Sequence, residues 1–167
     1  MALQKKICML GAFAVGKTSL VRRYVDSIFS DRYLTTVGVK IDKRMVTVSA
    51  AEVSLILWDI AGEDEISQVR TSYVRGAAGY LLVADGTRPA TIDVAQSIQQ
   101  RVEGEVGKLP FVVLLNKHDL QSVWSVSAGD IAALQRAGWT VQMTSARSGE
   151  AVEEAFQTLA ERVIRGQ

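Results

Sequence analysis

The sequence predicts an α/β protein in which helices cover both faces of a mostly parallel sheet. Short apolar runs rich in β-branched residues alternate with longer amphipathic stretches, the order expected of β–α–β units. The later runs are apolar on both faces, as the buried strands of parallel sheets are. We expect a three-layer fold with six strands, one antiparallel hairpin at an edge, and a single domain over residues 1–167.

The first part of the chain predicts a strand, a helix and a hairpin. An apolar run at residues 6–10 precedes a helix that starts near Lys17, where apolar residues recur at helical spacing. Apolar and polar residues then alternate over residues 39–48, which predicts a half-exposed strand. A turn at residues 49–51 joins this strand to a second run at 53–58, and the two form the expected hairpin.

Three later apolar runs predict three parallel strands, at residues 80–84, 111–115 and 140–143. Polar residues follow the first two of these runs. Ligands of open α/β sheets bind at the carboxyl ends of the strands, so these polar residues are candidates for a site. A final helix is predicted by acids in its first turn and by apolar residues on one face, namely Val152, Phe156, Leu159 and Val163.

The composition argues against several kinds of partner. Lysine and arginine number 19 against 18 aspartate and glutamate, which leaves no net charge to hold nucleic acid or an anionic membrane. The single cysteine, Cys8, lies in an apolar run and predicts a buried thiol in a reducing compartment. No run approaches the roughly 20 apolar residues of a membrane span, and neither terminus carries a lipidation motif. We therefore expect a cytoplasmic protein with no nucleic-acid partner and no direct membrane anchor.

A phosphate-binding loop follows the first strand. Residues 11–18, Gly-Ala-Phe-Ala-Val-Gly-Lys-Thr, match G-x-x-x-x-G-K-[ST] between a strand and a helix, where this motif is found. Backbone N–H groups and the positive helix end would surround the phosphates, Lys17 would add a charge on their outer oxygens, and Thr18 would offer Mg²⁺ a hydroxyl. The nucleotide-binding residues expected here are Gly11, Ala14, Val15, Gly16, Lys17, Thr18 and Ser19.

The run at residues 111–115 is followed by Asn-Lys-His-Asp, which indicates a guanine site. An aspartate at position 119 can accept hydrogen bonds from the N1–H and the exocyclic amine of guanine, whereas adenine offers no such pair. We expect Asn116 to tie this loop to the phosphate loop, Lys117 to cover the base, and His118 to be a solvent-facing spacer. Small residues after the run at 140–143 would let a backbone N–H approach the guanine O6, and they give the candidates Ser145, Ala146 and Arg147.

A third segment, Trp-Asp-Ile-Ala-Gly at residues 58–62, lies at the end of a predicted strand. Asp59 could hold a magnesium-bound water. Gly62 leaves a backbone N–H free to meet the γ-phosphate, because no side chain covers it. We therefore expect this segment to sense the third phosphate of the nucleotide.

These motifs, in this order and spacing, resemble those of the Ras superfamily of small GTPases, and residues 33–39 are similar to the first switch of its Rab branch. The resemblance implies that Thr36 contacts magnesium and the γ-phosphate and that Phe29 lies against the guanine, although Phe29 can also be a core residue. It implies slow GTP hydrolysis and partners that read two switch loops: an effector, an exchange factor and an activating protein. The metal ligands would be Thr18, Thr36 and Asp59, and the catalytic residues Lys17, Thr36, Gly62 and Glu63.

The chain departs from the family pattern at several positions. The usual glutamine is replaced by Glu63, which cannot donate a hydrogen bond to the γ-phosphate; alternatively, Glu63 belongs to a solvated acidic loop and contributes little. Phe13 stands where the family has a small residue, and we expect it to obstruct an arginine finger from an activator unless it packs on the second switch. Ile41 and Val74 replace aromatic residues of the Rab effector surface, although Trp58 remains.

Three functions remain to be compared. The leading hypothesis is a guanine-nucleotide switch that slowly hydrolyses GTP to GDP with Mg²⁺. The alternative is a GTP- or GDP-binding scaffold with little or no hydrolysis, which Glu63 and Phe13 favour. A P-loop kinase or ATPase is disfavoured by Asp119. The departures from the Rab pattern favour a soluble member of the superfamily, with a bacterial source as an open alternative.

Overall fold

The structure is a computed structural model that describes residues 3–25, 33–34, 39–62 and 68–166. Seven strands form one sheet in the order β2-β3-β4-β1-β5-β6-β7. Their bounds are β1 Leu3–Gly11, β2 Tyr33–Leu34, β3 Val39–Val48, β4 Ala51–Ile60, β5 Gly79–Asp85, β6 Phe111–Asn116 and β7 Val141–Met143. The helices are α1 Lys17–Tyr24, α2 Ala90–Val106, α3 Ala128–Arg136 and α4 Val152–Arg165, with single 3₁₀ turns η1 Thr71–Val74 and η2 Gln121–Val123.

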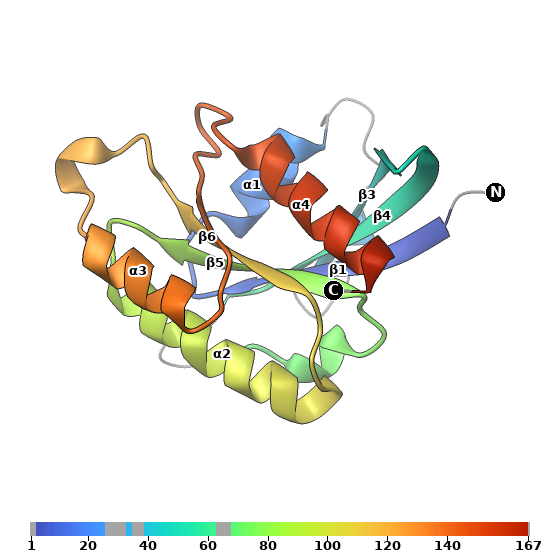
Figure 1. The fold of residues 1–167 in the computed structure, drawn as a ribbon, viewed down its shortest axis with the longest axis horizontal. Helices are drawn as coiled ribbons and strands as arrows, with labels where there is room; N and C mark the ends of the chain where they lie inside the picture. The colour runs from blue at the N-terminus through green and yellow to red at the C-terminus, as the bar shows by residue number, and fades with distance from the viewer. Residues whose placement is uncertain (1–2, 26–32, 35–38, 63–67, 167) are drawn as a thin grey trace.

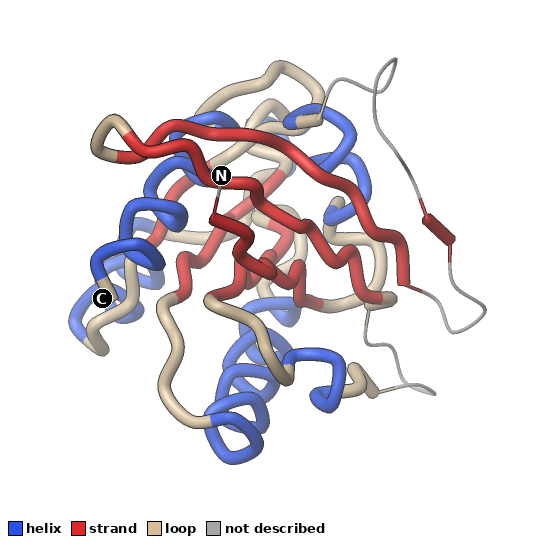
Figure 2. The backbone as a smooth tube through the Cα atoms, turned by 90° about the vertical axis from the view of Figure 1, so that its right-hand side faces the viewer, coloured by secondary structure: helices blue, strands red, loops and turns tan. Residues whose placement is uncertain are grey.

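The predicted α/β architecture is confirmed. Strands β4, β1, β5, β6 and β7 are parallel to one another, whereas β3 is antiparallel to β4, as expected of a hairpin. All six predicted strands are present. The sequence did not predict β2, a two-residue strand that pairs with the outer edge of β3 at Ile41 and Lys40 (Figure 2).

Helices cover both faces of the sheet, with α1 and α4 on one side and α2 and α3 on the other (Figure 1). Alternate residues of β1 explain why both faces are covered: Ile7 and Met9 belong to the core under α1 and α4, whereas Cys8 and Leu10 belong to the core under α2. The thiol of Cys8 is fully buried, as predicted. No helix in the described part of the chain is long and apolar enough to cross a membrane.

Helix α4 carries the predicted apolar stripe and packs it against α1 and the sheet. The ring of Phe156 stacks on that of Tyr24 at a centroid distance of 3.8 Å, and the Arg44 guanidinium lies over the Tyr24 ring, 4.0 Å from its centroid. Arg44 also forms an ion pair with Glu153 at 2.7 Å. One face of the hairpin, the first helix and the last helix are therefore joined by one set of contacts.

The order of the strands determines where a ligand can bind. Strand β1 lies between β4 and β5. Strands β2, β3 and β4 lie on one side of β1, and strands β5, β6 and β7 lie on the other side. The parallel strands end at one edge, which we call the carboxyl edge of the sheet. A crevice outside this edge, at the point where the strand order reverses, is the usual ligand site of open α/β sheets.

Candidate functional site

Five segments far apart in the sequence meet at the carboxyl edge of the sheet. They are the loop between β1 and α1, the end of β4, the turn after β5, the loop after β6 and the loop after β7. Strand register brings the last residue of β5 beside the last residue of β6, because Asp85 lies opposite Asn116. The predicted motifs therefore come together, along with a segment that the sequence did not single out.

The phosphate loop reaches α1 through Gly16, whose φ of 103° favours glycine. A Cβ at this position would collide with the side-chain nitrogen of Asn116. No side chain caps the first turn of α1. The N–H groups of this turn are therefore available to an anion, which the positive end of the helix would also attract.

Side chains from other segments hold the carbonyl groups of the phosphate loop. Three consecutive carbonyls accept hydrogen bonds in this way: Phe13 from Arg88 at 2.9 Å, Ala14 from Lys117 at 3.0 Å and Val15 from Asn116 at 3.0 Å. The bond from Asn116 is the link between the two loops that the sequence predicted. A loop whose carbonyls are already bonded is preorganised, so it need not be ordered when a ligand binds.

Lys17 is a buried cation at the centre of this loop, with only 6% of its surface exposed. Its ammonium group donates hydrogen bonds to the carbonyl oxygens of Ala12 at 3.0 Å and Gly11 at 3.4 Å. Burial lowers the pKa of Lys17 to about 8, although the negative charge of Asp59 acts in the opposite direction. A phosphate beside Lys17 would favour its charged form.

Thr18 and Asp59 form the centre where a metal could bind. The hydroxyl of Thr18 donates to a carboxylate oxygen of Asp59 at 2.5 Å, and Asp59 is 6% exposed. Burial raises the pKa of Asp59, whereas the bond from Thr18 and the charge of Lys17 lower it. Two adjacent hard oxygen ligands suit Mg²⁺, which binds proteins through one or two carboxylates and otherwise keeps water and phosphate ligands.

Gly62 touches the phosphate loop closely. A Cβ at this position would lie 2.7 Å from the Ala12 carbonyl oxygen, from the Lys17 nitrogen and from the Phe13 Cα. Because real Cβ atoms do not approach backbone atoms this closely, only glycine fits here without movement of one of the two segments. The structure thus brings the predicted phosphate sensor against the predicted phosphate loop.

The predicted guanine site is held together by its own side chains. Asn116 accepts hydrogen bonds at its oxygen from the Thr144 hydroxyl at 3.2 Å and the Ala146 N–H at 3.3 Å. One carboxylate oxygen of Asp119 accepts from the Ser145 hydroxyl at 2.7 Å. The loops after β6 and β7 are thereby joined, while Arg147 is exposed.

His118 differs from its prediction as a solvent-facing spacer. Its ring nitrogen Nδ1 lies 2.9 Å from both carboxylate oxygens of Glu150, and its ring meets Trp124 edge-on at 4.9 Å. The side chain is only 24% exposed. The prediction was wrong because the partners of His118 lie in segments that the sequence spacing does not connect with it.

Val74 and Phe13, two positions at which the chain departs from the family pattern, differ in their exposure to solvent. Val74 is fully buried in the core under α2, so its side chain offers no surface to an effector. The neighbouring residue Tyr73 is half-buried and packs against the same core, as Ile41 and Trp58 do. Phe13 is 63% exposed, so most of its ring faces solvent. Phe29, Thr36 and Glu63 lie outside the described residues.

Sequence reasoning pointed to the polar residues after the run at 80–84 but assigned no role to Asp85, the last residue of β5. Its carboxylate is completely buried and accepts from Lys117 at 2.8 Å and Arg88 at 3.0 Å through one oxygen, and from the N–H and hydroxyl of Thr87 through the other. Burial alone would raise the pKa of Asp85, but the bonds from Lys117, Thr87 and Arg88 lower it to about 2. Its position at the end of a buried strand was the available signal.

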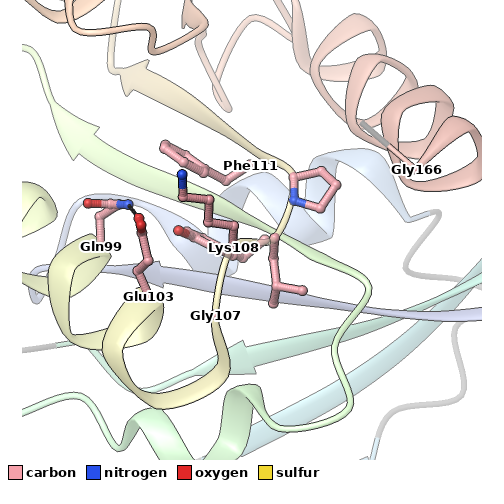
Figure 3. A pocket seen from close by; sticks show the side chains of 9 residues that line it. Gln99, Glu103, Gly107, Lys108, Phe111 and Gly166 are labelled. Atoms are coloured by element: carbon pink, nitrogen blue, oxygen red, sulfur yellow. Dashed lines mark hydrogen bonds between the residues drawn. The ribbon is translucent and has the colours of Figure 1, made fainter.

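A separate pocket of about 360 Å³ lies at the opposite end of the sheet (Figure 3). Tyr80 and Phe111, near the starts of β5 and β6, line it together with Gln99, Glu103 and Lys108. Since none of its lining residues belongs to the predicted motifs, this pocket is not part of the candidate site.

Comparison with known proteins agrees with the site. The Ras family model matches residues 6–165. The Ras-related protein Rab-7L1 of the rat is 34% identical over 95% of this chain and 81% of its own length. The Ras-related proteins Rab-13 of the dog and RabJ of Dictyostelium discoideum are 32% and 31% identical, over 95% and 98% of this chain and 79% and 64% of their own lengths. The chain therefore belongs to the Ras family and is a Rab-like, GTP-binding molecular switch with the GTPase activity typical of that family.

Proposed function

We propose that this chain binds GTP and GDP as one domain over residues 1–167, hydrolyses GTP slowly with Mg²⁺, and works in the cytoplasm. The observation that carries the proposal is the arrangement of the phosphate loop. Its carbonyls are bonded to Arg88, Lys117 and Asn116, and a buried lysine lies at its centre. This arrangement presents positive charge and backbone N–H groups to a polyphosphate.

Thr18 and Asp59 would hold Mg²⁺, in company with Thr36 from the first switch. Bound at the phosphates, Mg²⁺ supplies positive charge that offsets the charge on the transferred phosphoryl group. The residues of the chain add to this effect, because Lys17 lies within 3.4 Å of two loop carbonyls and is therefore fixed in position before the nucleotide binds. The Gly62 N–H would donate to the γ-phosphate.

Guanine would be selected by Asp119. Its oxygen Oδ1 accepts from Ser145, which restrains the carboxylate and leaves lone pairs on both oxygens for the two guanine donors. Lys117 is held between Asp85 and the Ala14 carbonyl, so its stem lies where it could cover the ring. A backbone N–H of the segment Ser145, Ala146 and Arg147 would approach O6; the Ala146 N–H, which donates to the Asn116 oxygen at 3.3 Å, would have to share its hydrogen between that oxygen and O6. Phe29 would lie against the other side of the base.

Slow hydrolysis is expected because Glu63 replaces the glutamine that orients the attacking water. A carboxylate can accept a proton from water but cannot donate to the γ-phosphate. The exposed ring of Phe13 at the mouth of the loop would crowd an arginine finger, so we propose that an activating protein of that type accelerates this chain weakly. An effector and an exchange factor would recognise the switch loops.

The nucleotide content of the purified protein tests this function. We expect chromatography to find bound GDP, and we expect a GTP load to convert to GDP over hours, faster with Mg²⁺ than with EDTA. Persistent GTP in the presence of Mg²⁺ would support the scaffold instead. A bound adenine nucleotide would overturn both hypotheses.

The role of Phe13 needs its own experiment. Single-turnover hydrolysis of the wild type, Phe13→Gly and Glu63→Gln is measured with and without an activating protein. We expect the two substitutions to increase the response. A response of several thousand-fold in the wild type would show that neither residue hinders an arginine finger.

A further inference from the structure

Arg88 connects the end of β5 with the phosphate loop, and none of the family motifs contains it. Its Nε donates to the Asp85 carboxylate at 3.0 Å, and its Nη2 donates to the Phe13 carbonyl at 2.9 Å. One planar guanidinium thus joins a buried anion and a loop carbonyl, a geometry that its rigid set of donors permits.

The backbone around Arg88 fixes where this side chain starts. The Arg88 N–H donates to the Asp85 carbonyl at 2.9 Å, and the Arg88 carbonyl accepts from the N–H and the hydroxyl of Thr91. Pro89 follows and has a restricted φ. Because the carboxylate of Asp85 is buried and held by Thr87 as well, the guanidinium is anchored at both ends.

Phe13, whose carbonyl Arg88 holds, is also a residue of the phosphate loop that Gly62 approaches closely. A Cβ on Gly62 would come within 2.7 Å of the Phe13 Cα, so the two backbones are in contact. The bonds from Lys117 and Asn116, by contrast, reach the next two carbonyls and come from the loop proposed to bind guanine. Arg88 therefore braces the part of the loop beside the proposed γ-phosphate sensor.

We propose that Arg88, anchored by Asp85, is a positioning residue that sets the Phe13–Gly62 contact and thereby favours GTP over GDP. The inference rests on the proposed function, since it assumes that Gly62 meets the third phosphate. Loss of Arg88 would let the Phe13 carbonyl turn, which disturbs contacts to the γ-phosphate more than those to the α- and β-phosphates. A residue that only stabilised the fold would affect both nucleotides alike.

The test measures dissociation of fluorescent GDP and of a fluorescent, non-hydrolysable GTP analogue from the wild type, Arg88→Ala and Arg88→Lys. We expect Arg88→Ala to accelerate release of the GTP analogue on the order of tenfold, as for loss of a charge-assisted hydrogen bond, and release of GDP by less than about threefold. Lysine keeps the charge but replaces the two separate donors of the planar guanidinium, Nε to Asp85 and Nη2 to Phe13, with a single nitrogen on a flexible stem, so Arg88→Lys should resemble Arg88→Ala.

The control is Arg75→Ala, which removes an exposed arginine paired with Glu105 away from the site and should change neither rate. Equal acceleration for both nucleotides, or none for either, would overturn the proposal. Wild-type behaviour of Arg88→Lys would also overturn it, because charge alone would then suffice. If the wild type itself bound neither GDP nor the analogue, the proposed function would fail rather than this inference.

Discussion

At the scale of single residues, the lowered pKa of Asp85 makes the free energy of unfolding depend on pH. Its pKa of about 2 lies below the ordinary value of 3.8, so between these values the unfolded chain binds more protons than the folded one. The stabilisation from Asp85 is therefore fully present above about pH 5 and is lost as the pH falls toward 2.

We expect Asp85→Asn to lower the free energy of unfolding at pH 7 by up to about 2 kcal/mol. The difference between wild type and variant should shrink as the pH is lowered from 6 to 3, which urea unfolding at several pH values measures. Asp93→Asn, at an exposed position of α2, is the control and should change stability by no more than about 0.5 kcal/mol. A difference that stays constant with pH would contradict the role of the Asp85 charge.

Gly62 permits a prediction about catalysis. Alanine here would place a Cβ 2.7 Å from two backbone atoms and the Lys17 nitrogen, so the end of β4 and the phosphate loop must move apart. We expect Gly62→Ala to slow single-turnover GTP hydrolysis at least about tenfold, because transition-state contacts depend on such positions.

The matched control is Gly104→Ala in α2, where a Cβ meets nothing within 4 Å. This variant should keep its hydrolysis rate and gain up to about 1 kcal/mol in stability from the better helix propensity of alanine. Normal hydrolysis by Gly62→Ala would show that the contact with the loop is not needed in the reaction.

At the scale of elements, the β3–β4 hairpin has a turn that its residues do not favour. Ser49 and Ala50 have φ values of 50° and 66°, between the paired residues Val48 and Ala51. Two-residue hairpin turns with positive φ at both positions favour asparagine and glycine, because other residues adopt this conformation at a cost.

We therefore expect Ala50→Gly to raise the free energy of unfolding by about 0.5–1 kcal/mol, measured by denaturant titration. Ala51→Gly, one residue later and at the start of β4, should lower it by about the same amount, because glycine is unfavourable in a strand. If both substitutions destabilised the protein, the turn would not be under the strain that its φ values indicate.

At the scale of the whole molecule, nucleotide binding should add to the free energy of unfolding. Five segments from β1 to β7 meet at the proposed site, so a ligand there holds together parts of the chain that otherwise meet only through the sheet. A ligand that binds only the folded state at 1,000 times its Kd adds about 4 kcal/mol.

We expect GDP with Mg²⁺ to raise the Tm by several degrees and EDTA to remove most of this gain. ATP at the same concentration should leave the Tm unchanged, because adenine offers the Asp119 carboxylate no matching pair of N–H donors. An equal shift with ATP would refute selection of guanine by Asp119.

The sequence by itself determined the fold class, the succession of six strands along the chain and the motifs at residues 11–18, 58–62 and 116–119. Each of these depends on local patterns: periodic apolar residues, or functional residues within a few positions of one another. Strand β2 escaped prediction because two residues carry no periodicity.

Only the tertiary structure decided which side chains complete the site. The site also includes Asp85, Arg88 and Thr144, because sheet register and packing bring separate segments together. These contacts cannot be predicted from the spacing of residues along the chain. The same reason explains the burial of Val74 and the pairing of His118 with Glu150. The phosphate and guanine loops could therefore be predicted from short sequence motifs, whereas the contacts that hold those loops in place form only when the sheet folds.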